Sequence, residues 1–307
     1  MTEDAKPSGG GLAEAARHRR QRLLGIGLMC LAVSSFSGID STAKYLNTQM
    51  DTVQVIWARY VFAFLLALVI ANPLSHPGML RTSRPVLQIL RSFLLVYATA
   101  ANFVALHFLR LDQTVTIGFS APFMVAALAG PLLGEWVGPR RWAAIAVGFI
   151  GVLIIIRPGI GGIHWTALLS FSGTIAYAFY IIITRILSYS DSSATTLFYS
   201  NLVGAAVLSF AVPFVWTTPQ SWFTVMLIVF MGGAAMTGHY LLILSYRFAP
   251  TSVVAPFIYS QIVSAVAIGY LVFGDLPDRW TLIGAAVVIA SGLYLLYRER
   301  MRGRAVV

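Results

Sequence analysis

The feature that most constrains this chain is a set of long apolar stretches that contain almost no charge. Between Ser192 and Gly274 the single charged residue is Arg247, and between Trp142 and Thr184 it is Arg157. Several stretches reach the roughly 18 apolar residues of a membrane-spanning helix. Only 10% of all residues are charged, against about 25% in soluble domains. The sequence therefore predicts an all-α polytopic membrane protein and excludes a water-soluble enzyme.

Ten membrane-spanning helices are expected from the apolar stretches and from the Pro, Gly and charged positions that interrupt them. The predicted spans are residues 23–44, 53–71, 86–108, 112–133, 141–156, 164–186, 194–216, 221–246, 251–273 and 280–297. An even number of spans returns the chain to the side on which it starts.

The distribution of Lys and Arg predicts the orientation, because these residues accumulate in cytoplasmic loops. With the N-terminus inside, most of the 21 Lys and Arg lie in inner segments. The outer segments hold Lys44, Arg110, Arg157 and Arg279. We therefore expect both termini to be cytoplasmic in a bacterial-type inner membrane. The net charge of +10 then reflects this bias and does not indicate nucleic acid.

The sequence also contains an internal repeat. Several pairs of positions recur in the same order and at a nearly constant offset. They are Lys44 and Arg185, Arg110 and Arg247, Gly134-Glu135 and Gly274-Asp275, and Gly151 and Gly292. Each repeat holds five spans, and because five is odd the second copy enters the membrane inverted. The prediction is ten helices as two inverted five-helix repeats, 23–157 and 164–298, between basic cytoplasmic tails at 1–22 and 299–307.

This arrangement resembles the EamA-type drug/metabolite transporter superfamily over about residues 23–300. The resemblance lies in the five-plus-five helices, the basic ends of spans one and six, and the Gly-Glu and Gly-Asp pairs after spans four and nine. Within the superfamily the pattern is similar to the YddG-like aromatic amino acid exporters of bacteria. It implies an exporter of aromatic and other apolar amino acids and related metabolites that works by alternating access. One departure is Pro122, which has no counterpart near Tyr259 in the ninth span.

Polar and aromatic residues near the middle of the spans are the candidate substrate-binding residues, since ligand pockets are mostly apolar with a few placed polar groups. They are Tyr97, Asn102, Ser120, Tyr177, Tyr180, His239, Tyr240, Tyr259 and Gln261. The alternative is that these side chains only bond neighbouring helices. Pro122 and Pro256 lie within spans and are expected to act as hinges, because each removes a backbone hydrogen bond.

The few charged residues within spans are a separate group of candidates. Asp40 and Arg59 are expected at similar depth near the outer ends of the first two spans, where they would form an ion pair. Lys44, one helical turn from Asp40, is a competing partner. We interpret this group as a structural clasp or outer gate, and the alternative is a proton-coupling carboxylate at Asp40. Arg91 lies near an inner helix end and is expected to extend towards the lipid headgroups.

The remaining motifs predict no cofactor and no metal, because the sequence has neither a phosphate-binding G-x-x-x-x-G-K-[ST] loop nor a metal-ligand cluster. Two other functions stay open: a passive channel, and an intramembrane enzyme with Ser120 as nucleophile and His239 as base. No acidic and basic pair is expected near the midplane, which favours a neutral zwitterion over a phosphate ester as substrate. The expected partners are a small molecule and the lipid bilayer, with no nucleic acid and no obligate protein partner.

Overall fold

The computed structural model describes residues 9–71, 77–134, 136, 138–157 and 165–304, and these form helices and connecting turns without a strand. Ten helices are long and apolar enough to cross a membrane, which confirms the predicted number. The helices are α1 (Gly9–Leu46), α2 (Thr52–Ala71), η1 (Pro77–Leu80), α3 (Pro85–Phe108), α4 (Leu111–Gly118), α5 (Ala121–Leu133), α6 (Pro139–Ile156), α7 (Trp165–Leu187), α8 (Ser193–Ala211), η2 (Val212–Phe214), α9 (Trp222–Phe248), α10 (Thr251–Val254), η3 (Ala255–Ser260), α11 (Gln261–Phe273) and α12 (Arg279–Arg304).

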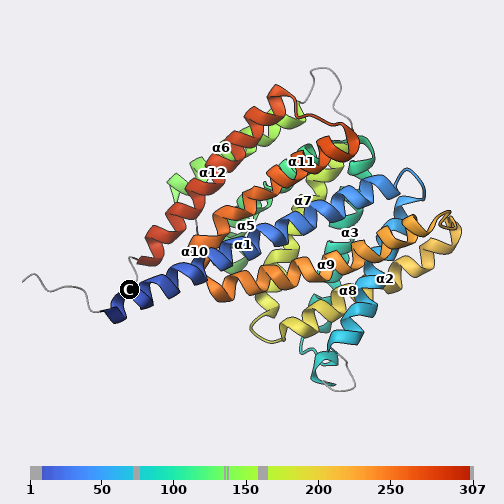
Figure 1. Ribbon diagram of the computed structural model, residues 1–307, viewed down its shortest axis with the longest axis horizontal. Helices are drawn as coiled ribbons and strands as arrows, with labels where there is room; N and C mark the ends of the chain where they lie inside the picture. Colours follow the sequence, from blue (N-terminus) through green and yellow to red (C-terminus); the bar gives the residue numbers. More distant parts are fainter. Residues whose placement is uncertain (1–8, 72–76, 135, 137, 158–164, 305–307) are drawn as a thin grey trace, which may run out of the picture.

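The helices of the two repeats are interleaved (Figure 1). Helix α1 packs along α9, and its repeat counterpart α7 packs along α3. Helix α2 contacts its counterpart α8, and α6 lies along its counterpart α12 at one edge of the molecule. Exchanging the first repeat with the second therefore turns the α1–α9 pair into the α7–α3 pair. The same exchange leaves the α2–α8 pair and the α6–α12 pair unchanged. This is the arrangement expected of inverted repeats.

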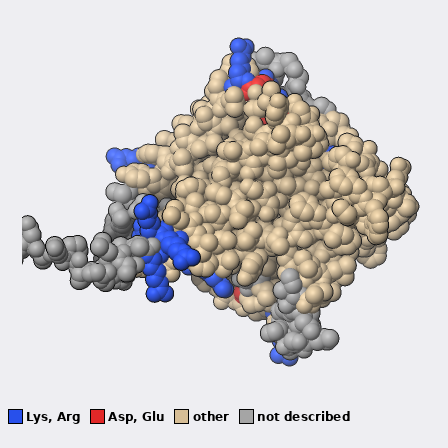
Figure 2. Space-filling model, viewed as in Figure 1, with Lys and Arg blue, Asp and Glu red and all other residues tan. Residues whose placement is uncertain are grey.

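The outer surface is apolar across the middle of the molecule. Figure 2 shows one broad face with no charge in its centre and with Lys and Arg at its edges. Large apolar side chains such as Phe210, Leu271 and Val69 are strongly exposed. In water this exposure would be costly, whereas in a bilayer these side chains contact lipid tails.

The first residues of α1 and the last residues of α12 lie at the same end of the molecule (Figure 1). We call this end the terminal side and the opposite end the distal side. Helix α1 runs from the terminal side to the distal side, so Lys44 near its end is distal. Because α3 and α7 cross the membrane in close contact, Gly173 of α7 is needed there: a Cβ atom at that position would lie 2.7 Å from the Cβ of Ala101.

The fourth span of each repeat is interrupted by a short turn or 3₁₀ segment, which we call its break, beside the predicted hinges Pro122 and Pro256. In the first repeat α4 ends at Gly118 and α5 begins at Ala121. In the second repeat the 3₁₀ segment η3 ends at Ser260 and α11 follows. The break is local: Ser120 Oγ donates to the Ile117 carbonyl oxygen at 2.7 Å.

The second break repeats the first in detail. Ser260 Oγ donates to the Phe257 carbonyl oxygen at 2.6 Å, which is the same bond to the third residue before it. The helices after the two breaks also end alike, at Gly134 with φ 74° and Gly274 with φ 70°. Glycine adopts this left-handed conformation without the strain a Cβ atom would cause. Two matching breaks and two matching ends show that both fourth spans share one design.

Candidate functional site

One face of α3 carries polar side chains through the centre of the helix bundle. Gln88, Arg91, Ser92 and Thr99 are buried on this face, and Asn102 continues it. Their spacing of three, four or seven residues places them along one side of the helix. The partners of these side chains come from α1, α2, α7 and α8. Helix α3 therefore organises the polar interior.

Arg91 is held inside the protein by four neutral acceptors. Its exposed fraction is 1%. Nε donates to Thr184 at 2.6 Å, Nη1 to Ser200 at 2.8 Å and to the Thr196 carbonyl at 3.1 Å, and Nη2 to Tyr180 at 2.8 Å. The guanidinium carbon also lies 4.4 Å from the centre of the Tyr180 ring. The expectation that Arg91 extends to the headgroups is therefore wrong, because α7 and α8 supply acceptors closer to it.

Asp40 and Arg59 lie at neighbouring levels but do not form the predicted ion pair. Asn102 Nδ2 donates to Asp40 Oδ1 at 3.1 Å, and Arg59 Nη1 donates to Thr99 Oγ1 at 2.8 Å. Thr99 and Asn102 are one helical turn apart on α3. Arg59 acts electrostatically on Asp40, yet each side chain is anchored on α3 instead of on the other.

Lys44 forms its ion pair with the second repeat. Its Nζ lies 2.6 Å from Asp275 Oδ2 and 4.8 Å from the centre of the Phe273 ring. Lys44 therefore does not compete for Asp40, because the chain after α11 brings a second carboxylate to the end of α1. The contact joins the two repeats on the distal side, and its role as a gate stays a prediction.

Aromatic and polar side chains of α7 and α9 complete this region. The rings of Tyr177 and Tyr180 are stacked, with centroids 5.4 Å apart and planes 16° apart. Arg59 and Arg91 act electrostatically on both Tyr177 and His239. We define the central cluster as these groups and the α3 face they adjoin. Its members are Asp40, Arg59, Arg91, Thr99, Asn102, Tyr177, Tyr180 and His239.

Four predicted residues, Ser120, Tyr97, Tyr240 and Gln261, lie outside the interactions of this cluster. Ser120 is fully buried, and its hydroxyl serves the helix break. Tyr97 is 47% exposed and bonds Ser172 at 2.8 Å, and Tyr240 is 63% exposed. Gln261 begins α11, and its backbone carbonyl accepts a hydrogen bond from Ser37. Their substrate-binding role stays a prediction.

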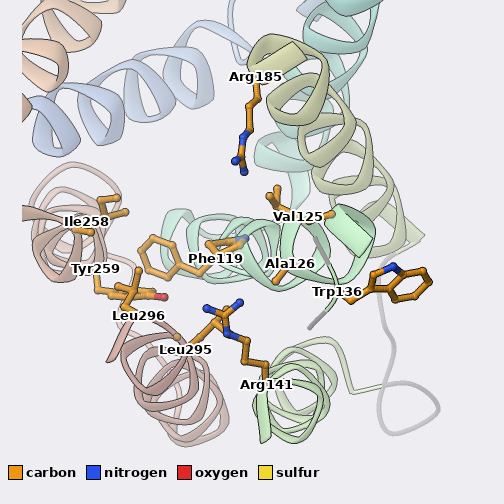
Figure 3. Close-up of a pocket in the computed structure, with 14 residues that line it drawn as sticks. Phe119, Val125, Ala126, Trp136, Arg141, Arg185, Ile258, Tyr259, Leu295 and Leu296 are labelled. Atoms are coloured by element: carbon orange, nitrogen blue, oxygen red, sulfur yellow. The ribbon is translucent and has the colours of Figure 1, made fainter. Parts of the chain in front are cut away.

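A pocket of about 580 Å³ lies beside the two helix breaks (Figure 3). Phe119 of the first break and Tyr259 of the second meet edge to face there, with ring centroids 4.9 Å apart. Pro122 also lines the pocket. Arg141 of α6 and Arg185 of α7 point into it from opposite sides in Figure 3. Arg141 lies in the first turn of α6, which packs beside the last turns of α12, and Arg185 lies in the last turn of α7. The pocket therefore opens towards the terminal side.

Sequence reasoning missed Phe119, Arg141 and Arg185. It assigned the two arginines to the positive charge of inner loops. Phe119 has no polar side-chain atom, so the search for polar groups within spans did not select it. However, Phe119 and Tyr259 are separated by the same number of residues as Gly134 and Gly274. Extending the repeat comparison to that position would have found it.

Comparison with known proteins decides what kind of membrane protein this is. The sequence profile of the EamA-like transporter family matches residues 23–157 and again residues 164–298. The chain belongs to the EamA-like transporter family. The two matched segments have the same bounds as the two predicted repeats. As a member of this family, the protein is a membrane transporter of small metabolites and not an enzyme.

Similar proteins of named function carry different metabolites. An S-adenosylmethionine uptake transporter of Rickettsia bellii is 29% identical over 90% of this chain and 94% of its own length. A riboflavin transporter of Rhizobium johnstonii is 29% identical over 90% of this chain and 92% of its own. A solved crystal structure covers 92% of this chain and 99% of its own, with a TM-score of 0.62 and 15% identity, and shows the shared fold. The YddG-like resemblance is not reflected in the names of these relatives.

Proposed function

We propose that this protein moves a small metabolite with a planar ring across the bacterial inner membrane by alternating access, and that S-adenosylmethionine is the first candidate. The observation that carries this proposal is the pair of broken fourth spans, which meet at the Phe119–Tyr259 contact beside the pocket. Transporters built from inverted repeats place their substrate sites at the repeat interface, where such discontinuous helices lie.

The size and walls of the pocket support a ring-bearing substrate. A volume of about 580 Å³ lies within the range of about 300–1,000 Å³ that small-molecule sites occupy. Phe119 and Tyr259 offer ring faces or edges to a planar group. Each aromatic contact adds about 0.5–1.5 kcal/mol beyond area burial. Such contacts favour rings in general and leave finer selection to polar groups.

The relatives support the same substrate class. S-adenosylmethionine and riboflavin both join a planar heteroaromatic ring to a hydroxylated five-carbon group, a ribose ring in the first and a ribityl chain in the second. These names belong to the relatives, and we extend only the shared chemistry to this chain. Uptake into the cell then becomes the favoured direction.

The second candidate function is export of aromatic and other apolar amino acids, as the sequence resemblance implies. The stacked Tyr177–Tyr180 pair favours it, because stacked phenol rings offer an apolar face to an aromatic side chain. Tryptophan shares a planar ring with S-adenosylmethionine, and both carry an α-amino acid group.

The orientation is part of this proposal. The terminal side is the cytoplasmic side, as the Lys and Arg distribution predicts. Lys44–Asp275 and the bond from Arg157 to Asp278 join elements of the two repeats on the distal side. The structure then represents a state closed towards the outside, with its pocket near the cytoplasm.

Proteoliposomes with the purified protein test the function. Uptake of labelled S-adenosylmethionine, riboflavin and tryptophan is measured beside glucose 6-phosphate, and empty liposomes are the control. We expect S-adenosylmethionine to exchange fastest and the sugar phosphate not to move. Transport of the sugar phosphate without the ring-bearing compounds would contradict the proposal. Tryptophan flux without S-adenosylmethionine flux would favour the second candidate.

A further inference from the structure

We propose that Asp40 and Arg59 bind the α-amino acid head of the substrate, Asp40 taking the ammonium group and Arg59 the carboxylate. This inference rests on the proposed function and adds to it the part of the substrate that is recognised and the two side chains that recognise it.

The first support is that the two charges are close but unpaired. No nitrogen of Arg59 lies within 4.0 Å of an Asp40 oxygen, although the two groups interact electrostatically. Two opposite charges inside a protein gain most of their stabilisation from direct contact. These two are instead held at successive levels by Asn102 and Thr99 on α3. A ligand that carries both charges would pair with each of them in turn.

The second support is unused hydrogen-bonding capacity. Arg59 Nε is buried and has no hydrogen-bond partner among the described residues, whereas Nη1 donates to Thr99 and the guanidinium carbon lies 5.2 Å from the centre of the Tyr60 ring. Asp40 receives one bond, to Oδ1 from Asn102. A guanidinium has five donors and a carboxylate about four acceptor positions. A carboxylate ligand would satisfy Nε of Arg59, and an ammonium ligand would use the second oxygen of Asp40.

Arg91 is the other guanidinium of the central cluster and is less suited to this role. Its Nε, Nη1 and Nη2 already donate to Thr184, Ser200 and Tyr180. It therefore positions α7 and α8 around the cluster, whereas Arg59 keeps an unfilled donor. This difference assigns the carboxylate of the substrate to Arg59.

The surroundings fit the remainder of such a substrate. Tyr177 and His239 lie within the electrostatic reach of Arg59. Tyr177 stacks on Tyr180, and His239 packs against Phe36 with ring centroids 5.0 Å apart. Aromatic groups beside a charged pair suit a molecule with a zwitterionic head and a planar ring. None of these groups lines the Phe119–Tyr259 pocket, so this head site is a second position on the path of the substrate. A riboflavin-like substrate has the ring but no such head, so this site would distinguish the two.

Competition by substrate analogues tests the inference. Labelled S-adenosylmethionine uptake into proteoliposomes is inhibited with decarboxylated S-adenosylmethionine, which lacks the carboxylate, and with 5′-methylthioadenosine, which lacks the whole head. We expect the unlabelled parent compound to compete at least tenfold better than either analogue. This comparison uses the wild-type protein, so it does not depend on whether a variant folds. If tryptophan proves to be the substrate, tryptamine and indole-3-propionate take the analogues' places.

Variants then assign the two charges. Arg59→Gln should weaken competition by the parent compound about tenfold and should leave competition by the decarboxylated analogue unchanged. Arg59→Lys should restore part of the difference between the two compounds. Asp40→Asn should weaken competition by every ligand that carries the ammonium group. Arg22→Gln, which removes an exposed guanidinium at the start of α1, is the matched control and should match wild type.

Three outcomes would overturn the inference. One is 5′-methylthioadenosine competing as well as the parent compound. Another is Arg59→Gln weakening the parent and the decarboxylated analogue equally. The third is Asp40→Asn abolishing proton-driven uphill transport without changing the ranking of ligands, which would assign Asp40 to proton coupling. Transport of ring compounds would continue in each case, so the proposed function would stand. Loss of all transport in the wild-type protein would instead remove the function itself.

Discussion

At the residue scale, Arg91 shows how a charge is kept inside a membrane span without a carboxylate. Its donors reach hydroxyl and carbonyl oxygens on two neighbouring helices, and Tyr180 covers one face of the guanidinium. A lysine has three donors on one nitrogen atom and cannot reach acceptors on both sides. The planar guanidinium group of Arg91, with its several N–H donors, therefore connects α3 to α7 and α8.

We expect Arg91→Lys to lower the free energy of unfolding by about 2–4 kcal/mol, since at least two charged hydrogen bonds are lost from a buried site. Thermal unfolding in detergent measures the change. Arg84→Lys, an exposed substitution just before the same helix, should leave the unfolding temperature unchanged. Equal temperatures for the two variants would contradict the structural role of Arg91.

Asp191 ties the α7–α8 turn to the start of α3 and predicts a pH dependence. Partial burial alone would raise the pKa of Asp191, but hydrogen bonds from Thr82, Gln88 and Ser83 outweigh it and lower this pKa to about 2. A carboxyl group with a depressed pKa stabilises the folded protein above its unfolded value of 3.8 and loses this effect as pH falls towards 2.

Wild-type stability should therefore be insensitive to Asp191 between pH 7 and pH 5 and should fall below about pH 4. Asp191→Asn should unfold at a lower temperature at pH 6 and show a smaller loss on acidification. Thr82→Val removes the 2.5 Å hydrogen bond to Asp191. Its unfolding temperature at pH 6 should lie between those of the wild type and Asp191→Asn. A steeper acid loss in Asp191→Asn than in wild type would reverse this assignment.

At the scale of elements, the broken fourth spans are the feature that most separates this fold from a simple helix bundle. Pro122 stands at the second position of α5, where its missing N–H is not needed. Continuing α4 into α5 would require that donor. The proline therefore keeps the break open, together with the bond from Ser120 to Ile117.

Pro122→Ala should allow α4 and α5 to join and should lower the transport rate at least fivefold while the folded yield is kept. Pro131→Ala is the matched control, because Pro131 lies inside the same helix away from the break. Transport rates in proteoliposomes compare the two. A larger loss in Pro131→Ala would contradict the hinge role of Pro122.

The spans and the hinge prolines beside their breaks were predictable from the sequence, whereas the contacts made at the breaks were not. The spans follow from apolar stretches and from charged loops, and both can be read directly from the sequence. The break at Ser120 depends on a side chain that bonds Ile117 and on the contact between Phe119 and Tyr259 of the other repeat. Pro122 predicts a hinge close to this position, but the contact that forms there between the two repeats leaves no mark in the sequence pattern.

Most members of the central cluster were predictable, but Thr99, the buried position of Arg91 and the partners of the members were not. Asp40, Arg59, Tyr177 and His239 stand out because polar groups are rare in spans. Which partners Asp40 and Arg59 find depends on the rotation of α3, because that helix presents Asn102 as donor and Thr99 as acceptor on one face. Helix rotation is set by packing against neighbours and leaves no direct mark in one sequence.

At the scale of the whole molecule, the two inverted repeats require an even number of spans and both termini on one side. Reporter fusions after Arg81 and after Arg304 should both read cytoplasmic, and a fusion after Gln220 should read periplasmic. The reason is the concentration of Lys and Arg in the loops on the terminal side. A periplasmic reading at Arg304 would contradict the even number and the inverted arrangement together.

The Lys44–Asp275 ion pair is a contact whose effect on alternating access can be tested. It joins the repeats on the distal side, while the pocket lies on the terminal side. The two side chains are 17% and 27% exposed, and pairs of this kind contribute about 1 kcal/mol at most. Removing the pair should therefore shift the balance between the two states by up to about fivefold and should not unfold the protein.

Cysteine labelling measures this shift. With Cys30→Ser as background, Leu296→Cys places a thiol in the pocket, where an impermeant maleimide reacts from the terminal side. Lys44→Asp and Asp275→Lys should each slow labelling up to about fivefold, because they favour the state in which the terminal side closes. The double variant restores an opposite-charge pair across the same contact and should recover the wild-type rate. Labelling that stays unchanged in both single variants would show that the distal pair does not bias the two states.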